Sequence, residues 1–257
     1  MLLAIDVGNT ETVLGVFDKK KLLCHFRIST DRDRTGDELA IIVADLLRLQ
    51  QLKLQDISAV IVSSVVPHYV SALSKMARDH LKMSPLILGP GVKTVMPILY
   101  ENPHEVGADR IANAVAAFSL YGGPAIVVDF GTATTFDVIS EKGEYLGGAI
   151  APGLQISADA LFAVAAKLSK VDIVRPQAVI GRNTTESLQS GILFGYAGQV
   201  DTMVNRIREE LGKKPVIIAT GGLAELVVPE CKTVKKLDVL LTLKGLQIIY
   251  EKNVSAS

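Results

Sequence analysis

Short apolar runs, each bounded by turn-forming residues, open the chain and return after its middle. Runs of this length with alternating or continuous apolar residues are typical of β-strands. The runs that predict strands in these two regions cover residues 2–7, 12–18, 21–29, 125–129, 134–139 and 143–150. Three strands in close succession therefore open each region.

The two regions match when the chain is shifted by 123 positions. The shift needs no gap and superposes Asp6 on Asp129, Gly8 on Gly131 and Leu23 on Leu146. Such internal similarity predicts two related halves. The Tyr-Gly-Gly-Pro segment at 121–124 is the predicted break, so we expect an N-terminal half of 1–121 and a C-terminal half of 122–257. The pattern leaves open whether the final helix packs on the first half.

Helical periodicity follows each group of strands. Thr35 and Glu38 have capping-box spacing ahead of an apolar stripe, so a helix is predicted over 35–51. Further helices are predicted over 68–81, 107–120, 155–168 and 184–211, and from residue 223 onward. Further strands are predicted over 57–62, 85–88 and 216–220. This mixture predicts an α/β protein.

The amino-acid composition limits the kinds of binding partner that the protein is expected to have. Hydrophobic residues make up 49% of the chain, which is enough for a sizeable core. The 27 basic and 27 acidic residues balance, which argues against a nucleic-acid partner. No uncharged apolar run is long enough to predict a membrane span. Cys24 and Cys231 lack CxxC spacing and are expected to be reduced thiols in a cytoplasmic protein.

Three glycine-containing turns are the candidate chemistry. Two of them, at 6–10 and 129–134, join predicted strands, and Gly221-Gly222 ends a strand and opens a helix. Backbone N–H groups in such turns can hold phosphate oxygens, and an aspartate beside them can reach a cation or its waters. One such turn is more often only a turn, but three in this order predict a nucleotide site. The chain contains neither a P-loop nor a G-x-G-x-x-G sequence.

These three segments resemble the phosphate-1, phosphate-2 and adenosine motifs of the actin-like ATPase and sugar-kinase superfamily. Gly107-Ala108-Asp109-Arg110, with Tyr100 ahead of it, makes the chain similar to type III pantothenate kinases. The resemblance implies two duplicated actin-like (ribonuclease H-like) halves, with mixed sheets flanked by helices around a central nucleotide cleft. It also implies a homodimer that transfers the ATP γ-phosphoryl group to pantothenate, giving 4'-phosphopantothenate, the first step of coenzyme A biosynthesis.

The resemblance also implies roles for the residues of the glycine turns. Asp6 would orient Mg²⁺ through water, and Asp129 would bind a monovalent cation, K⁺ or NH₄⁺. The ATP-binding residues that it implies are Asp6, Val7, Gly8, Asn9, Thr10, Glu11, Thr12, Val13, Thr132, Gly221 and Gly222. An oxygen donor beside polyphosphate suits either ion, so the sequence alone does not choose between them.

The acceptor site is expected to contain Tyr100, Gly107, Ala108, Asp109, Arg110 and Thr184. By resemblance Asp109 is the general base for the pantothenate hydroxyl; from the residues alone, a first-turn helix aspartate or an ion pair with Arg110 would be favoured. Arg110 suits a carboxylate or a phosphate. Thr184 begins a predicted helix, whose N-terminus could seat the pantothenate carboxylate, by resemblance from across the dimer interface.

Three other functions stay open on the sequence. The nearest is another small-molecule kinase of the same superfamily, acting on a sugar or a small acid. A nucleotide-sensing regulatory protein is the second, although the chain shows no appended helix-turn-helix. The third is an actin-type filament protein, for which a chain of 257 residues has little room.

Overall fold

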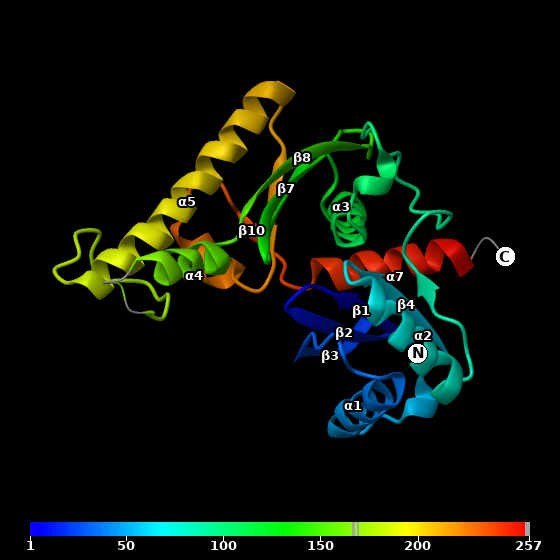
Figure 1. Ribbon diagram of the computed structural model, residues 1–257. Helices are drawn as coiled ribbons and strands as arrows, with labels where there is room; N and C mark the ends of the chain where they lie inside the picture. The colour runs from blue at the N-terminus through cyan, green and yellow to red at the C-terminus, as the bar shows by residue number, and fades with distance from the viewer. Residues whose placement is uncertain (166–167, 169, 255–257) are drawn as a thin grey trace. The chain divides into compact units, whose positions relative to one another are not determined.

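Two five-stranded sheets with the same strand order organise the chain in a computed structural model that describes residues 1–165, 168 and 170–254 (Figure 1). The first sheet has the order β3-β2-β1-β4-β5 and the second β10-β9-β6-β7-β8. The central strand is β1 in the first sheet and β6 in the second. On one side of it the two successive strand pairings are antiparallel, and on the other side both are parallel. Two mixed sheets with matching topology confirm the predicted duplication.

The strands of the first sheet are β1 Leu2–Val7, β2 Glu11–Asp18, β3 Lys21–Ser29, β4 Ala59–Ser64 and β5 Leu86–Ile87. Those of the second sheet are β6 Ala125–Phe130, β7 Ala133–Ile139, β8 Tyr145–Pro152, β9 Val216–Thr220 and β10 Lys236–Leu237. The helices are α1 Gly36–Leu49, α2 Pro67–His80, α3 Ala108–Tyr121, α4 Leu154–Val164, α5 Thr184–Leu211, α6 Ala224–Val227 and α7 Leu241–Val254. None of the helices in the described ranges is both long and apolar enough to cross a lipid bilayer.

A β-bulge occurs at the same point of both sheets. Between β2 and β3 the pairing passes over Leu23, and between β7 and β8 it passes over Leu146. These are two residues that the 123-position shift superposes. The ungapped match is nevertheless wrong for the middle strands, because Val7 pairs with Thr12 whereas Phe130 pairs with Thr134. The β6–β7 turn is one residue shorter than the β1–β2 turn. The β7–β8 turn is one residue longer than the β2–β3 turn, so the two regions match again at the bulge.

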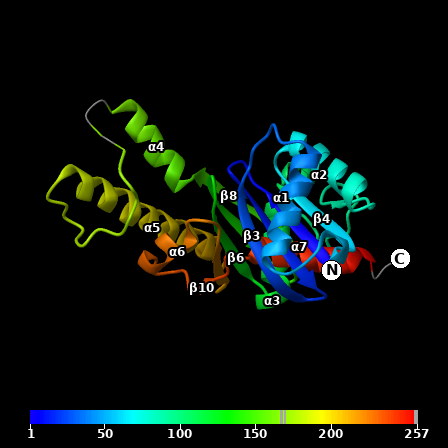
Figure 2. The ribbon, with the colours of Figure 1, turned by 90° about the horizontal axis from the view of Figure 1, so that it is seen from below.

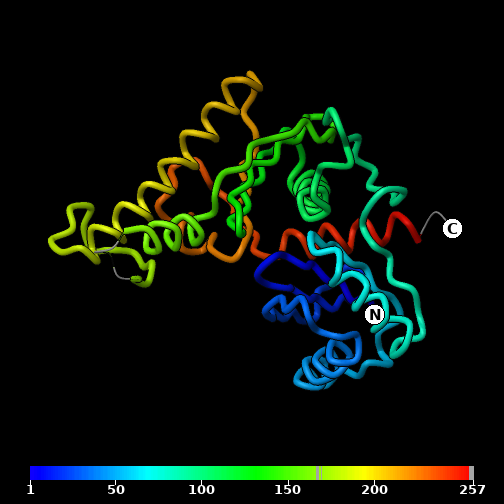
Figure 3. The backbone as a smooth tube through the Cα atoms, viewed as in Figure 1, coloured from blue at the N-terminus to red at the C-terminus, as the bar shows by residue number. Residues whose placement is uncertain are grey.

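Contacts divide the chain into two units. Unit 1 contains residues 1–116 and the C-terminal segment from Leu241, and unit 2 contains Ala117–Leu240. The backbone trace in Figure 3 can be followed out of unit 1 within α3 and back into it just before α7. The division predicted from sequence, 1–121 and 122–257, assigns α7 to the second half, whereas α7 packs on β1, β2 and β4.

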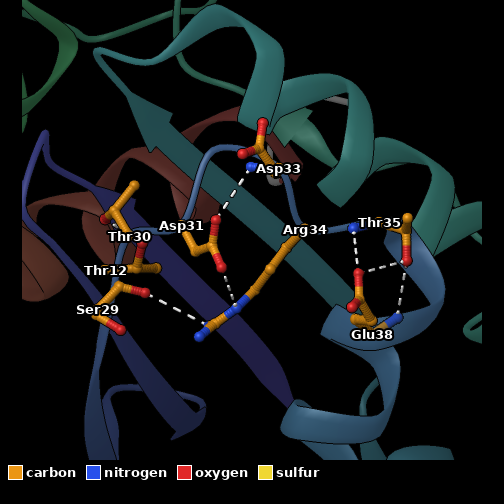
Figure 4. Close-up of polar contacts among 8 residues, drawn as sticks. All are labelled: Thr12, Ser29, Thr30, Asp31, Asp33, Arg34, Thr35 and Glu38. Carbon is orange, nitrogen blue, oxygen red and sulfur yellow. Dashed lines mark hydrogen bonds and ion pairs between the residues drawn. The ribbon is translucent and has the colours of Figure 1, made fainter.

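Unit 1 is a sheet covered by helices on both faces. Helices α1 and α2 bury one face through a core that contains Leu39, Leu47 and Leu73. The predicted capping box starts α1: Thr35 Oγ1 accepts the Glu38 N–H, and the Glu38 carboxylate accepts the Thr35 N–H (Figure 4).

Helix α7 covers the opposite face of the unit 1 sheet. Gly245 allows a close approach to α3, because a Cβ at this position would lie 2.0 Å from the Ala112 carbonyl oxygen. Next to it, Thr242 Oγ1 donates a hydrogen bond of 2.7 Å to Asn113 Oδ1. The contact therefore ties the last helix to the first part of α3.

Unit 2 buries one face of its sheet under α5, with α4 and α6 beside it (Figure 2). The prediction of α5 is confirmed at both ends, with Asn183 as its N-cap and left-handed Gly212 as its C-cap. Two helix ends differ from the prediction. Helix α4 ends at Val164, and residues 166–167 of the predicted helix lie outside the described residues. The helix after residue 223 is a single turn, because Pro229 follows it closely.

Candidate active site

The β1–β2 hairpin carries the first glycine turn at the edge of unit 1. The Gly8 N–H donates to the Glu11 carbonyl over 2.9 Å, and a Cβ on Gly8 would lie 3.0 Å from that oxygen. Asn9 and Thr10 are exposed at the tip, while Asp6 is partly exposed at the end of β1, paired with Val13. The turn therefore presents short polar side chains and backbone groups beside a carboxylate. This arrangement suits phosphate and a hydrated cation.

The loop after β3 fastens this turn. Arg32 Nη2 donates to Asn9 Oδ1 over 3.2 Å, and the Thr30 N–H donates to the Thr10 carbonyl over 2.9 Å. Beneath them the hydroxyls of Thr12 and Thr30 are 2.8 Å apart (Figure 4). Alternating charges in this loop do not reveal from the sequence which residue each side chain will contact.

Arg34 and Arg27 complete the support of this hairpin. Figure 4 shows Arg34 folded back on its own loop, with Nη1 3.4 Å from the Ser29 carbonyl and Nε 3.7 Å from Asp31 Oδ2. Arg27 on β3 forms an ion pair with Glu11 at the start of β2. The start of β2 is thus tied to β3, and Arg34 holds the loop that follows β3.

The Gly107–Arg110 motif lies where α3 begins, also in unit 1. Arg110 is only 8% exposed, and its backbone N–H donates to Asp109 Oδ1 over 2.8 Å. Desolvation by burial raises the pKa of the Asp109 carboxyl, against the lowering effects of the Arg110 N–H and guanidinium. A carboxylate with a raised pKa is a better proton acceptor than an exposed aspartate.

Glycine is required at position 107 for this geometry. A Cβ there would lie 2.5 Å from Asp109 Oδ1, so any larger residue would displace the carboxylate. The predicted substrate residue Tyr100 is partly buried in the loop that leads to this motif, ahead of a 3₁₀ turn at Pro103–Glu105. Asn102 caps that turn by accepting the His104 N–H.

In unit 2 the structure brings Asp129 and Gly221 together. Asp129 on β6 pairs with Thr220 at the end of β9, and Gly221 follows with a φ of +96°. A Cβ on Gly221 would lie 2.5 Å from both Asp129 Oδ1 and the Phe130 nitrogen. The predicted phosphate-2 and adenosine motifs are therefore in direct contact, with Gly222 next along the chain.

Gly153 holds the tip of the β6–β7 hairpin. Its N–H donates to the Thr132 carbonyl over 3.1 Å, and a Cβ on it would lie 2.1 Å from that oxygen. Thr132 itself is exposed. The sequence analysis missed Gly153; the glycine before a predicted helix was the available signal.

Thr184 is the exposed first residue of α5. Asn183 Oδ1 accepts the Glu186 N–H over 2.9 Å, which confirms the predicted helix start. The reciprocal bond of a capping box is displaced by one residue, since the Glu186 carboxylate accepts the Arg182 N–H over 2.9 Å. Thr184 thus has a side chain exposed at a helix N-terminus, where the backbone dipoles favour an anion.

The predicted site residues thus fall into separate groups. Unit 1 holds the turn at 6–13 and the motif at 107–110, and unit 2 holds Asp129 with Gly221 and, elsewhere, Thr184. No group of three or more His, Cys, Asp or Glu side chains suited to a metal occurs among the described residues.

Comparison with known proteins supplies the family. The model of the type III pantothenate kinase family matches residues 2–206. The type III pantothenate kinase of Moorella thermoacetica is 56% identical over 253 residues, which are 98% of this chain and 100% of the relative.

Two solved structures are similar in fold alone. Component A of the (R)-2-hydroxyglutaryl-CoA dehydratase of Acidaminococcus fermentans is 16% identical with a TM-score of 0.60, over 98% of both chains. The ROK hexokinase of Thermus thermophilus is 14% identical with a TM-score of 0.53, over 100% of this chain and 99% of that one. The fold is therefore that of the actin-like ATPases and sugar kinases, and the chain belongs to the type III pantothenate kinase family.

Proposed function

We propose that this protein transfers the γ-phosphoryl group of ATP to the hydroxyl of pantothenate, giving 4'-phosphopantothenate. The observation that carries the proposal is the 56% identity, over nearly the whole of both chains, to a relative named as a type III pantothenate kinase. A coupled assay of ADP release with pantothenate as acceptor, run with and without K⁺, tests it. No pantothenate-dependent ADP release under either condition would contradict it.

Asp109 would accept the proton of the pantothenate hydroxyl as the phosphoryl group arrives. Phosphoryl transfer depends mainly on positioning the reactants and neutralising charge, so one well-placed carboxylate is the base that it requires. The raised pKa of Asp109, whose side chain is half-buried, supports this role. Arg110 would bind the carboxylate or a phosphate through its guanidinium, and Tyr100 would contact pantothenate.

A divalent cation such as Mg²⁺, when bound with ATP, would neutralise charge on the phosphates. Asp6 fits the role of its water-mediated ligand, because its carboxylate is partly exposed beside the Gly8 turn. We assign Asp129 to a monovalent cation, K⁺ or NH₄⁺, beside Thr132 and Gly221. The exposed tips of the two hairpins would each contact phosphate, while Gly221-Gly222 would admit the adenosine.

Substitutions should separate the two aspartates. Asp6→Asn should raise the Mg²⁺ concentration needed for half-maximal rate, since the metal and its waters lose an anion. Asp129→Asn should instead change the response to K⁺, or abolish activity that K⁺ cannot rescue. Titrations of both ions against the initial rate measure this. Identical responses from the two variants would contradict the division of roles.

We also propose a homodimer. A groove of about 520 Å³ between α4 and α5 is lined largely by apolar and small residues, among them Ala158, Leu161 and Ile192. Val164 at the end of α4 is 86% exposed. An apolar groove beside an exposed valine supports an interface with a second copy of the chain.

The acceptor pocket would be shared between subunits, with Thr184 of one copy facing the pantothenate held near Asp109 of the other. Mixing inactive Asp109→Asn and Thr184→Trp variants under subunit exchange tests this. A mixed dimer then has one site with both defects and one with neither. With random reassortment half of the dimers are mixed, so activity should recover to roughly a quarter of wild type. No recovery would mean that each pocket lies within one chain.

The principal alternative function is a kinase that phosphorylates another small molecule in place of pantothenate, because the fold also occurs in a hexokinase. A screen of acceptor alcohols against the same ADP-release assay distinguishes the two. We further propose a cytoplasmic location, which agrees with the free thiols of Cys24 and Cys231. We also propose 1–121 and 122–257 as the two functional halves, with α7 of the second half packed on the sheet of the first.

A further inference from the structure

Ser63 lies beside Asp6 on the neighbouring strand of unit 1. The two residues pair directly in the parallel register of β1 and β4. Leu3, Ile5 and Val7 belong to the core under α1 and α2. Since side chains alternate along a strand, Asp6 and its partner Ser63 point to the other face, which α7 covers.

The Ser63 hydroxyl is fully buried, with 0% of the residue exposed, and it has no hydrogen-bond partner among the described residues. Buried hydroxyls nearly always find a partner, and an unpaired one needs a specific explanation such as an ordered water or ion. The next residue offers a contrast: Ser64 Oγ accepts the Val66 N–H over 3.0 Å and donates to the Val66 carbonyl over 3.1 Å. The end of β4 could therefore satisfy a serine locally, but it does so only for Ser64.

Ser63 lies near the end of β4 that is next to the first glycine turn. The chain after β4 stays close to the first glycine turn, because the Val65 N–H donates to the Val7 carbonyl over 3.1 Å. Neighbouring strands are about 4.8 Å apart, so the side chains of the paired residues Ser63 and Asp6 are neighbours on this face of the sheet. The face between them is thus lined by a carboxylate and a hydroxyl.

We propose that Ser63 positions the water shell of the divalent cation that Asp6 holds, and so acts as a positioning residue for the metal–nucleotide complex. Mg²⁺ gives up its waters reluctantly, and those waters require hydrogen-bond acceptors. The Ser63 hydroxyl would accept from one of these waters, which would then keep its orientation toward Asp6. This inference rests on the proposed function only in taking the ligand to be a metal-bound adenine nucleotide.

The test is the affinity for ADP measured by calorimetry, with Mg²⁺ and in its absence with a chelator. Ser63→Ala should weaken binding of Mg·ADP by about tenfold, the usual lower range for partners of metal-bound groups, and should leave metal-free ADP binding unchanged. The melting temperature without ligand should not fall, because the hydroxyl that is removed has no hydrogen-bond partner within the described part of the chain.

Tyr69→Phe is the matched control. The Tyr69 hydroxyl is also buried with no hydrogen-bond partner in the ranges that the structure describes, but Tyr69 belongs to the apolar core under α1 and α2. Tyr69→Phe should leave the affinities for Mg·ADP and for metal-free ADP unchanged. Unaltered Mg·ADP binding in Ser63→Ala would overturn the inference, as would equal losses with and without metal. A wild-type protein that bound no Mg·ADP would instead contradict the proposed kinase function, and the inference with it.

Discussion

Asp109→Asn should lower the turnover number by about 10²–10⁴, the range that general acid–base catalysis contributes. The amide keeps the shape of the carboxylate but cannot accept the proton of the acceptor hydroxyl. ADP affinity should be nearly unchanged, since the proposed partner of Asp109 is the acceptor. The measurement is the coupled ADP-release rate at saturating substrates. Turnover above about a third of wild type would exclude Asp109 as the base.

The same substitution should raise the melting temperature at neutral pH. The folded-state pKa of Asp109 is raised by burial, so the ionised form opposes folding, and stability falls as the pH rises through that pKa. Asparagine removes the buried charge. A first-turn aspartate that only stabilised α3 would give the opposite result, because its loss would destabilise the helix. Asp45→Asn, at an exposed ion pair with Arg48 on α1, is the control and should leave turnover unchanged.

The raised pKa also gives the direction of the pH profile. As the pH falls, Asp109 is protonated and can no longer act as a base, so turnover should fall. The midpoint of this acid limb should lie above the ordinary aspartate value of 3.8.

Gly221→Ala should destabilise unit 2 by about 2–4 kcal/mol and abolish nucleotide binding. Two costs combine: a φ of +96° is strained for alanine, and its Cβ would lie 2.5 Å from the Asp129 carboxylate and the Phe130 nitrogen. Urea unfolding monitored by circular dichroism, together with ADP calorimetry, measures both effects. The displaced groups are backbone as well as side chain, so small rotamer changes cannot relieve the overlap.

Gly212→Ala separates strain from overlap. Gly212 at the end of α5 also has a positive φ, of 61°, but a Cβ there would meet nothing within 4 Å. We expect a cost of about 1 kcal/mol and unchanged ADP binding. Equal effects of the two substitutions would mean that the contact of Gly221 with Asp129 contributes nothing.

Local signals predicted much of the fold. The capping box at Thr35 located α1, and Asn183 located α5, because both caps use side chains within three residues of the helix start. The sheet order was not predictable in this way, since strand pairing depends on contacts distant in sequence. Strand β10, two exposed residues at a sheet edge, gives no apolar pattern at all.

The candidate site was predicted at its turns but not in its supports. Asp6 and Asp129 were predicted as site residues because the same turn occurs twice in the sequence. Arg32, which contacts Asn9, and Gly153, which contacts Thr132, were missed because their roles arise only when loops meet in three dimensions. The buried hydroxyl of Ser63 gave no signal either, since serine is common at strand ends.

The position of α7 has a consequence for folding during synthesis. Its partners β1, β2 and β4 are made early, and all of unit 2 is translated before α7 appears. Unit 2 is continuous in sequence, whereas the core of unit 1 is complete only when its two distant segments meet. Until α7 is available, one apolar face of the first sheet is uncovered, and a chaperone would be needed during this interval. A chain truncated just before Leu241 and released from the ribosome should be protease-resistant in unit 2 and sensitive in unit 1.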